Sequence, residues 1–267
     1  MIKSLKYVLK ENFSNIYRIY SISKYELLSD MRDSKLGLFW NFANPTIQIL
    51  TYWFVFGFVM SRNSVDGISY LPWMLGGMVV WFFISPCITN GCNAIYSKIN
   101  VITKMKFPVS ILPTTVVMKE LFNHFCLMII LVFLFSLYGF FPSLQWFELI
   151  YYLLSAIIFC IALSMVTSVL NMLARDTKKL ISSCMRLLLY MTPILWEITR
   201  LPEWLQGIIK LNPIYYIVNG YRDIFFYHNG IFAYTDIMIS FWIITIALLF
   251  IGSFLIYKFK FKFIDMI

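Results

Sequence analysis

The chain has 267 residues, of which 60% are hydrophobic and only 13% charged, and its formal net charge is +9. An ordinary soluble domain is about half apolar and about a quarter charged. The composition therefore excludes a soluble globular protein and indicates an integral membrane protein. The positive charge requires no nucleic acid, because lysine and arginine beside a membrane commonly face anionic headgroups.

Residues 1–39 are predicted to form a cytoplasmic N-terminal segment that contains an amphipathic helix. Its apolar residues repeat at helical spacing, at Tyr20, Leu27, Leu28, Met31 and Leu38. Such a helix lies in the membrane interface. It is either a plain anchor or a gate at a lateral opening for a lipid-linked substrate.

Six apolar stretches follow, each near or above the roughly 20 residues that a helix needs to cross a bilayer. They are residues 40–60, 70–95, 109–140, 147–173, 180–197 and 235–257. The predicted fold is an all-α integral membrane protein with six transmembrane helices. Residues 40–257 form the membrane domain and residues 258–267 a basic cytoplasmic tail. Asn44-Pro45 marks the start or an early kink of the first span.

Residues 198–234 are apolar but repeatedly broken, and each half is too short to span. We expect external re-entrant half-helices between spans 5 and 6, hinged at Asn212-Pro213. Non-helical backbone at membrane depth is tolerated where protein or a water cavity covers it. This segment is therefore either part of an exit pathway or a surface cap.

Basic residues are distributed unequally between the two sides of these spans. Sixteen Lys and Arg residues lie in the N-terminal segment, in the two loops around residues 98–106 and 175–179, and in the tail, against four on the opposite side. Positively charged loops remain in the cytoplasm. Both termini of a multi-pass plasma-membrane protein are therefore expected inside.

Charged residues within the apolar stretches suggest function, because they are costly in lipid. Lys119, Glu120, His124 and Arg186 either pair with one another or line a polar entrance. Aromatic residues are also abundant within the first two spans. The candidates for stacking on sugar rings along a translocation pathway are Tyr52, Trp53, Phe54, Phe58, Trp81 and Phe82. Packing or contact with lipid is the alternative for each of them.

Other classes of membrane protein fit less well. A membrane-embedded transferase usually has clustered acids and histidines, whereas the acids here are scattered and only two histidines exist. A secondary transporter often shows broken internal repeats, and none is convincing here. No Cys/His cluster has metal spacing. No phosphate-binding GxxxxGK[ST] loop is present, so the chain is predicted to bind no ATP itself.

Five sequence motifs together resemble the membrane subunits of ABC type-2 polysaccharide exporters. They are LGLFWNFANP from Leu36, KMKFPVSILP from Lys104, ARDT from Ala174, PILW from Pro193 and LNPIY from Leu211. Within this family, the chain is most similar to the exporters of wall teichoic acid. The exporters of O-antigen and of capsule share the same plan and are the alternative.

The resemblance implies a homodimer with two ATP-binding cassette subunits, which carry ATP and Mg²⁺. It also implies transport of a polymer on undecaprenyl diphosphate from the inner to the outer face of the membrane. The cytoplasmic loops would then couple to the ATPase. Residues of this kind are Lys98, Asn100, Lys104, Lys106, Phe107, Arg175 and Asp176.

Three cations near the cytoplasmic leaflet are candidates for binding the diphosphate headgroup. They are Arg32, Lys35 and Lys98. Arginine is suited to bidentate phosphate contact, and lysine contributes a point charge. Binding of anionic lipid by the same residues is the alternative.

Overall fold

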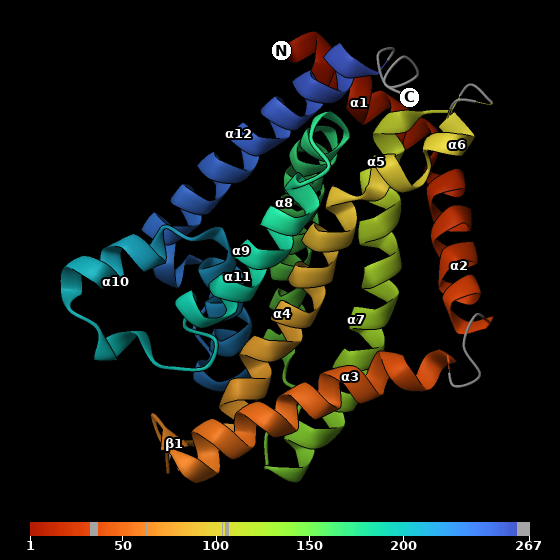
Figure 1. Ribbon diagram of the computed structural model, residues 1–267. Helices are drawn as coiled ribbons and strands as arrows, with labels where there is room; N and C mark the ends of the chain where they lie inside the picture. The colour runs from red at the N-terminus through yellow and green to blue at the C-terminus, as the bar shows by residue number, and fades with distance from the viewer. Residues whose placement is uncertain (33–36, 62–63, 103, 105–106, 261–267) are drawn as a thin grey trace.

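The computed structural model describes residues 1–32, 37–61, 64–102, 104 and 107–260. These residues are mostly helical, with one short hairpin (Figure 1). The N-terminus, the end of the last described helix at Phe259, α5 (Ala94–Ser97) and α6 (Ile99–Ile102) lie together, and we call this the terminal end. The hairpin β1 (Ser64–Val65) and β2 (Ile68–Ser69) lies at the opposite end, which we call the hairpin end.

Five helical segments are long and apolar enough to cross a membrane, and they confirm five of the six predicted spans. They are Phe42–Val59, Tyr70–Cys92, Val109–Leu137, Leu144–Leu173 and Ile231–Phe259. The first comprises most of α3 (Gly37–Tyr52) and the π-helix η1 (Trp53–Val59). The third consists of η2 (Val109–Ile111) and α7 (Leu112–Leu137). The fourth consists of η3 (Leu144–Glu148) and α8 (Leu149–Leu173), and the fifth of η6 (Ile231–Tyr234) and α12 (Thr235–Phe259).

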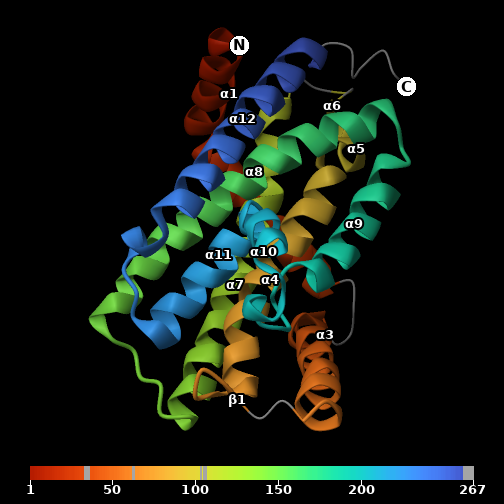
Figure 2. The ribbon, with the colours of Figure 1, turned by 90° about the vertical axis from the view of Figure 1, so that its left-hand side faces the viewer.

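The central helix is α4 (Tyr70–Cys92), which packs against α7, α8, α9 and α11. Its side chains Met74, Met78 and Ile84 are fully buried. Close packing against α8 requires a small residue, because a Cβ on Gly91 would lie 2.2 Å from the Ser164 hydroxyl oxygen. Small residues allow such approach between helices in membranes. α3 lies across α4 near the hairpin end and contacts it less than α7 or α8 does (Figures 1 and 2).

The N-terminal helices lie along the bundle. α1 (Ile2–Ser14) packs on α12, and α2 (Ile16–Arg32) packs on α7. Ser23 is buried, and its hydroxyl lies within hydrogen-bond distance of two acceptors, the carbonyl oxygens of Ile19 and Thr115. The face of α2 that contacts the bundle thus contains Ser23 and Glu26, whereas Leu28 of the predicted apolar stripe is 41% exposed.

The predicted fifth span, residues 180–197, is not confirmed as one continuous membrane-crossing helix. The helix found there, α9 (Thr177–Met191), has 15 residues. At about 1.5 Å per residue it is shorter than the hydrocarbon core of a bilayer. The helix ends because Thr192 precedes Pro193 and adopts an extended conformation, with φ −82° and ψ 138°.

Two short helices follow, as the break at Asn212-Pro213 predicted. They are α10 (Glu203–Lys210) and α11 (Pro213–Arg222), which continues into the π-helical segment η5 (Asp223–Tyr227). Asn212 caps α11 by accepting a hydrogen bond from the amide of Ile214, and Pro213 occupies the first helical position. α11 is buried between α4, α8 and α12, whereas no residue of α10 is buried.

Candidate functional site

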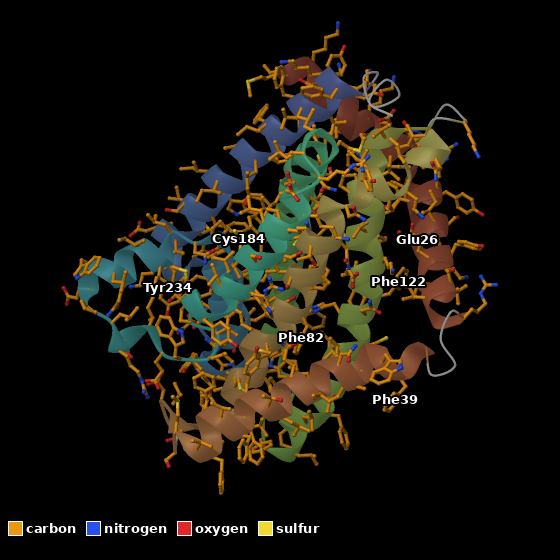
Figure 3. All side chains as sticks on the ribbon, in the orientation of Figure 1. Glu26, Phe39, Phe82, Phe122, Cys184 and Tyr234 are labelled. Atoms are coloured by element: carbon orange, nitrogen blue, oxygen red, sulfur yellow. The ribbon has the colours of Figure 1, made fainter. Side chains whose placement is uncertain are left out.

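A cavity of about 560 Å³, whose wall combines polar and apolar side chains, lies between four helices, α3, α4, α7 and α9. We call it the central cavity. Figure 3 labels Phe82, which lies on α4 and contributes to its wall. Because three of the four helices belong to apolar spans, the polar side chains in this wall are costly in lipid and suggest a functional role.

Each of the four helices contributes two polar side chains one turn apart. These pairs are Asn44 and Gln48 on α3, Ser85 and Thr89 on α4, Glu120 and Asn123 on α7, and Ser182 and Arg186 on α9. Residues three or four positions apart share one face of a helix. The four polar faces therefore converge on one space, although each helix is otherwise mainly apolar or amphipathic.

Glu120 is the most constrained of these groups. It is 7% exposed, and its carboxylate accepts hydrogen bonds from Asn90 at 3.1 Å and from Asn123 at 3.0 Å. Arg186, on the opposite helix, donates to the Ser183 hydroxyl at 3.0 Å. The Glu120 carboxylate and the Arg186 guanidinium thus both line the central cavity, and each is hydrogen-bonded to neutral side chains. Such walls offer acceptors and donors to a polar substrate.

The intramembrane charges do not pair with one another in the described residues. The Lys119 ammonium forms an ion pair with Asp30 of α2 instead. His124 is buried, and its Nε2 lies 3.2 Å from the Tyr221 hydroxyl. The prediction of mutual pairing is therefore wrong, and the alternative, a polar lining, describes Glu120 and Arg186. The tertiary fold brings α2 to α7, and the sequence contained no sign of this contact.

Three of the six predicted pathway aromatics line the central cavity, and three do not. Tyr52, Trp81 and Phe82 contribute to its wall. Trp53, Phe54 and Phe58 are outside it and are 40%, 54% and 71% exposed. The difference arises because α3 and η1 present only one face to α4 and α9.

Two of the three predicted headgroup ligands, Arg32 and Lys98, lie in the described residues. Arg32 is exposed at the end of α2, with its guanidinium 5.7 Å from the centre of the Tyr25 ring. Lys98 forms an ion pair of 2.6 Å with Glu26, which Figure 3 labels on α2. Lys35 lies outside the described residues. A shared role of these cations in binding a headgroup stays a prediction.

The two predicted coupling loops meet at the terminal end. The Arg175 guanidinium lies 5.1 Å from the centre of the Tyr96 ring on α5. Asn100, Lys104 and Asp176 are exposed. Phe107 packs against the smaller hydrophobic core at this end, and Lys106 lies outside the described residues. This exposed, basic surface fits contact with another protein, and its coupling role stays a prediction.

Comparison with known proteins identifies the class. Residues 17–226 match the family described as ABC-2 type transporter, and the chain belongs to this membrane-protein family. With its apolar helices, it is a multi-pass membrane protein of the transport class. One relative, called O-antigen export system permease protein RfbA of Klebsiella pneumoniae, is 31% identical over 92% of this chain and 93% of the relative.

Two further relatives have the same printed name. A second Klebsiella pneumoniae protein is 30% identical over 92% of this chain and 93% of its own length. A Myxococcus xanthus protein is 29% identical over 79% of this chain and 81% of its own length. These relatives are polysaccharide-export permeases, so the broader expectation of polysaccharide export is supported. They favour the O-antigen alternative over wall teichoic acid.

Sequence reasoning missed most polar residues of the central cavity. The overlooked signal was the spacing of uncharged polar residues within apolar spans, as for Asn44 with Gln48 and Ser85 with Thr89. A search of the sequence for charged and aromatic residues alone misses such pairs, because amides and hydroxyls are uncharged. A helical period applied to amides and hydroxyls would have found them.

Proposed function

We propose that this chain is the transmembrane subunit of an ATP-driven exporter of a lipid-linked polysaccharide of the O-antigen kind. The observation that carries the proposal is the central cavity, a partly polar space between helices of an ABC-2 type chain, three of which belong to apolar spans. The names of the relatives support polysaccharide as the cargo. Wall teichoic acid is the less supported cargo.

In this proposal the terminal end faces the cytoplasm, because basic residues concentrate there. Two copies of the chain form the permease, and two ATP-binding cassette subunits dock on α5, α6 and the turn at Arg175. In place of the predicted fifth span, the short α9 and the half-helices α10 and α11 together form one crossing, with α10 and α11 on the outer side. ATP and Mg²⁺ belong to the partner subunits, and undecaprenyl diphosphate carries the polymer.

The chemistry of the central cavity fits passage of a glycan. Sugar hydroxyls both donate and accept hydrogen bonds, and the cavity offers amides, hydroxyls, a carboxylate and a guanidinium. Trp81 and Phe82 add ring surfaces against which a sugar can pack. Many weak polar contacts hold a polymer without trapping it, which transport requires.

Filling the cavity tests the site. Ser85→Trp places a bulky ring in the central cavity, and surface polymer should fall at least tenfold while lipid-linked polymer accumulates inside. Phe54→Trp is the matched control, because Phe54 lies outside the cavity and is 54% exposed. Permease levels in the membrane must be equal. Normal export by Ser85→Trp would remove the central cavity from the route.

Depletion of the chain tests the cargo. The polymer retained in depleted cells should be a lipid-linked polysaccharide, measured by sugar composition and phosphorus content after extraction. A polymer rich in polyol phosphate would favour wall teichoic acid instead. Retention of no lipid-linked polymer would contradict the export function itself.

A further inference from the structure

A second cavity, of about 420 Å³, lies at the hairpin end, and we call it the hairpin-end pocket. Its wall combines the β1–β2 turn, the start of α4, the segment after α9, and the helices α10, α11 and η5. It shares no lining residue with the central cavity. It therefore needs an explanation of its own.

Aromatic rings form much of this wall. They are contributed by Trp73, Trp196, Tyr215, Tyr227 and Tyr234, and Figure 3 labels Tyr234 near α10. An aromatic ring presents a flat apolar face, and Trp and Tyr also have a polar tip. Such walls suit a ligand with both C–H faces and hydroxyl groups, which is the character of a sugar ring.

Two carboxylates in the pocket are held in place by neighbouring side chains. Asp223 accepts hydrogen bonds from the amides of Asn219 at 2.7 Å and Asn229 at 3.2 Å. Asp66 accepts one from the Tyr227 hydroxyl at 2.9 Å. Burial raises the pKa of Asp223 to about 6, so this carboxylate is ionised at neutral pH. Fixed acceptors lose little freedom when a ligand binds.

The charges of the pocket argue against an anionic ligand. Arg222 lines it but is 4% exposed, and its guanidinium donates to the carbonyls of Trp73, Pro193 and Ile194. Three of its five N–H donors are thus engaged, and its positive charge remains. In the described part of the chain, the lining cations Arg222 and Lys210 stand against three lining carboxylates, Asp66, Glu197 and Asp223. A phosphodiester would meet more repulsion than attraction there.

Two other ligand classes fit less well. Among the described residues, no three His, Cys, Asp or Glu side chains are grouped so that they could hold a metal ion. A lipid tail would exclude water from these carboxylates and offer them no hydrogen bonds beyond those from Asn219, Asn229 and Tyr227, which is unfavourable. A neutral glycan segment supplies hydroxyl donors to the carboxylates and ring faces to the aromatics.

We propose that the hairpin-end pocket is a binding site for a neutral glycan segment, separate from the central cavity. The inference deepens the proposed export function and rests on it for the source of the glycan. At the hairpin end, the pocket would hold sugar units that have left the membrane. It would also discriminate against polymers of polyol phosphate.

Direct binding tests the proposal. The full chain is reconstituted in lipid nanodiscs with its ATP-binding partner. The probe is the polymer of the host, cut to short oligomers, freed of lipid and diphosphate by mild acid, and end-labelled. Asp66→Asn should weaken binding about tenfold, because a charged acceptor is lost. Asn tolerates the positive φ of 49° at this turn, so the hairpin should fold.

Glu203→Gln is the matched control, because Glu203 is an exposed acid at the start of α10 that does not line the pocket. It should bind the oligomer like the parent. A synthetic glycerol-phosphate oligomer of equal length should bind at least tenfold more weakly than the neutral oligomer. Equal binding by Asp66→Asn and the parent, equal binding of the two oligomers, or no binding by the parent would overturn the proposal.

These outcomes are separable from failure of the export function. If depletion of the chain retains lipid-linked polysaccharide but the free oligomer does not bind the parent, only the hairpin-end pocket is refuted. If depletion retains none, the export function fails whatever the oligomer does.

Discussion

Helices α3 and α4 are both apolar enough to cross a membrane but have opposite surroundings. None of the residues of the span in α3 and η1 is buried in this chain, whereas most residues of the span in α4 are buried. An apolar sequence thus predicts that a helix enters a membrane, but it does not predict whether protein or lipid covers it. The difference lies in side-chain fit, since α4 carries glycines where neighbouring side chains approach closely.

The largest expected effect is truncation of a ring in α4. Phe83 is 1% exposed, so Phe83→Ala should lower the free energy of unfolding by about 3–5 kcal/mol, through lost contacts and a cavity. Phe54→Ala, on the exposed face of η1, should cost less than about 1 kcal/mol in the isolated chain. Thermal unfolding in detergent measures both. Equal losses would show that α3 is packed as firmly as α4.

The next effect concerns the charge that ties α4 to α11. The Arg222 guanidinium lies 3.6 Å from the centre of the Trp73 ring and donates hydrogen bonds to three backbone carbonyls. A guanidinium stays charged at neutral pH. Arg222→Lys keeps the charge but loses the planar fork, and it should cost about 2–3 kcal/mol.

Chemical unfolding of Arg222→Lys provides the measurement. Arg200→Lys is its matched control, because Arg200 is half exposed and pairs only with Glu197 in the described residues. The control should change stability by less than about 1 kcal/mol. An equal effect of both substitutions would mean that the buried bonds of Arg222 contribute little.

A third comparison concerns close helix approach. Gly91→Ala should destabilise by about 1–3 kcal/mol, because its Cβ would lie 2.2 Å from the Ser164 hydroxyl oxygen. Gly57→Ala in η1 meets only side-chain atoms at 3.2 Å or more and should be tolerated. Ser164→Gly should rescue Gly91→Ala by removing the clashing atoms. Failure of this rescue, measured by thermal unfolding, would place the strain elsewhere.

The smallest expected effect is at the ion pair between α2 and the loop after α5. Glu26→Gln removes the partner of Lys98, whose side chain is 38% exposed, and should cost at most about 1 kcal/mol. Because salt screens such pairs, the parent should approach the variant in stability as the salt concentration rises. A salt-independent loss above 2 kcal/mol would mean that α2 is held as tightly as α4.

The sequence by itself determined the membrane class, five spans and the break between α10 and α11. These features depend on local patterns: long apolar runs require lipid, and Asn212-Pro213 ends one helix and starts the next. Helices α1 and α2 of the N-terminal segment also form because helical spacing is a local property, but the interfacial position predicted for the amphipathic helix stays a prediction.

Tertiary structure alone decided how these elements meet. The central cavity requires four helices to turn their polar pairs toward one another, and no single stretch of sequence specifies that arrangement. Likewise Lys119 pairs with Asp30, and Arg222 reaches Trp73, across long separations in sequence. The position of α4 inside the bundle follows from steric fit between helices rather than from hydropathy, because lipid and a protein core are nearly equally apolar.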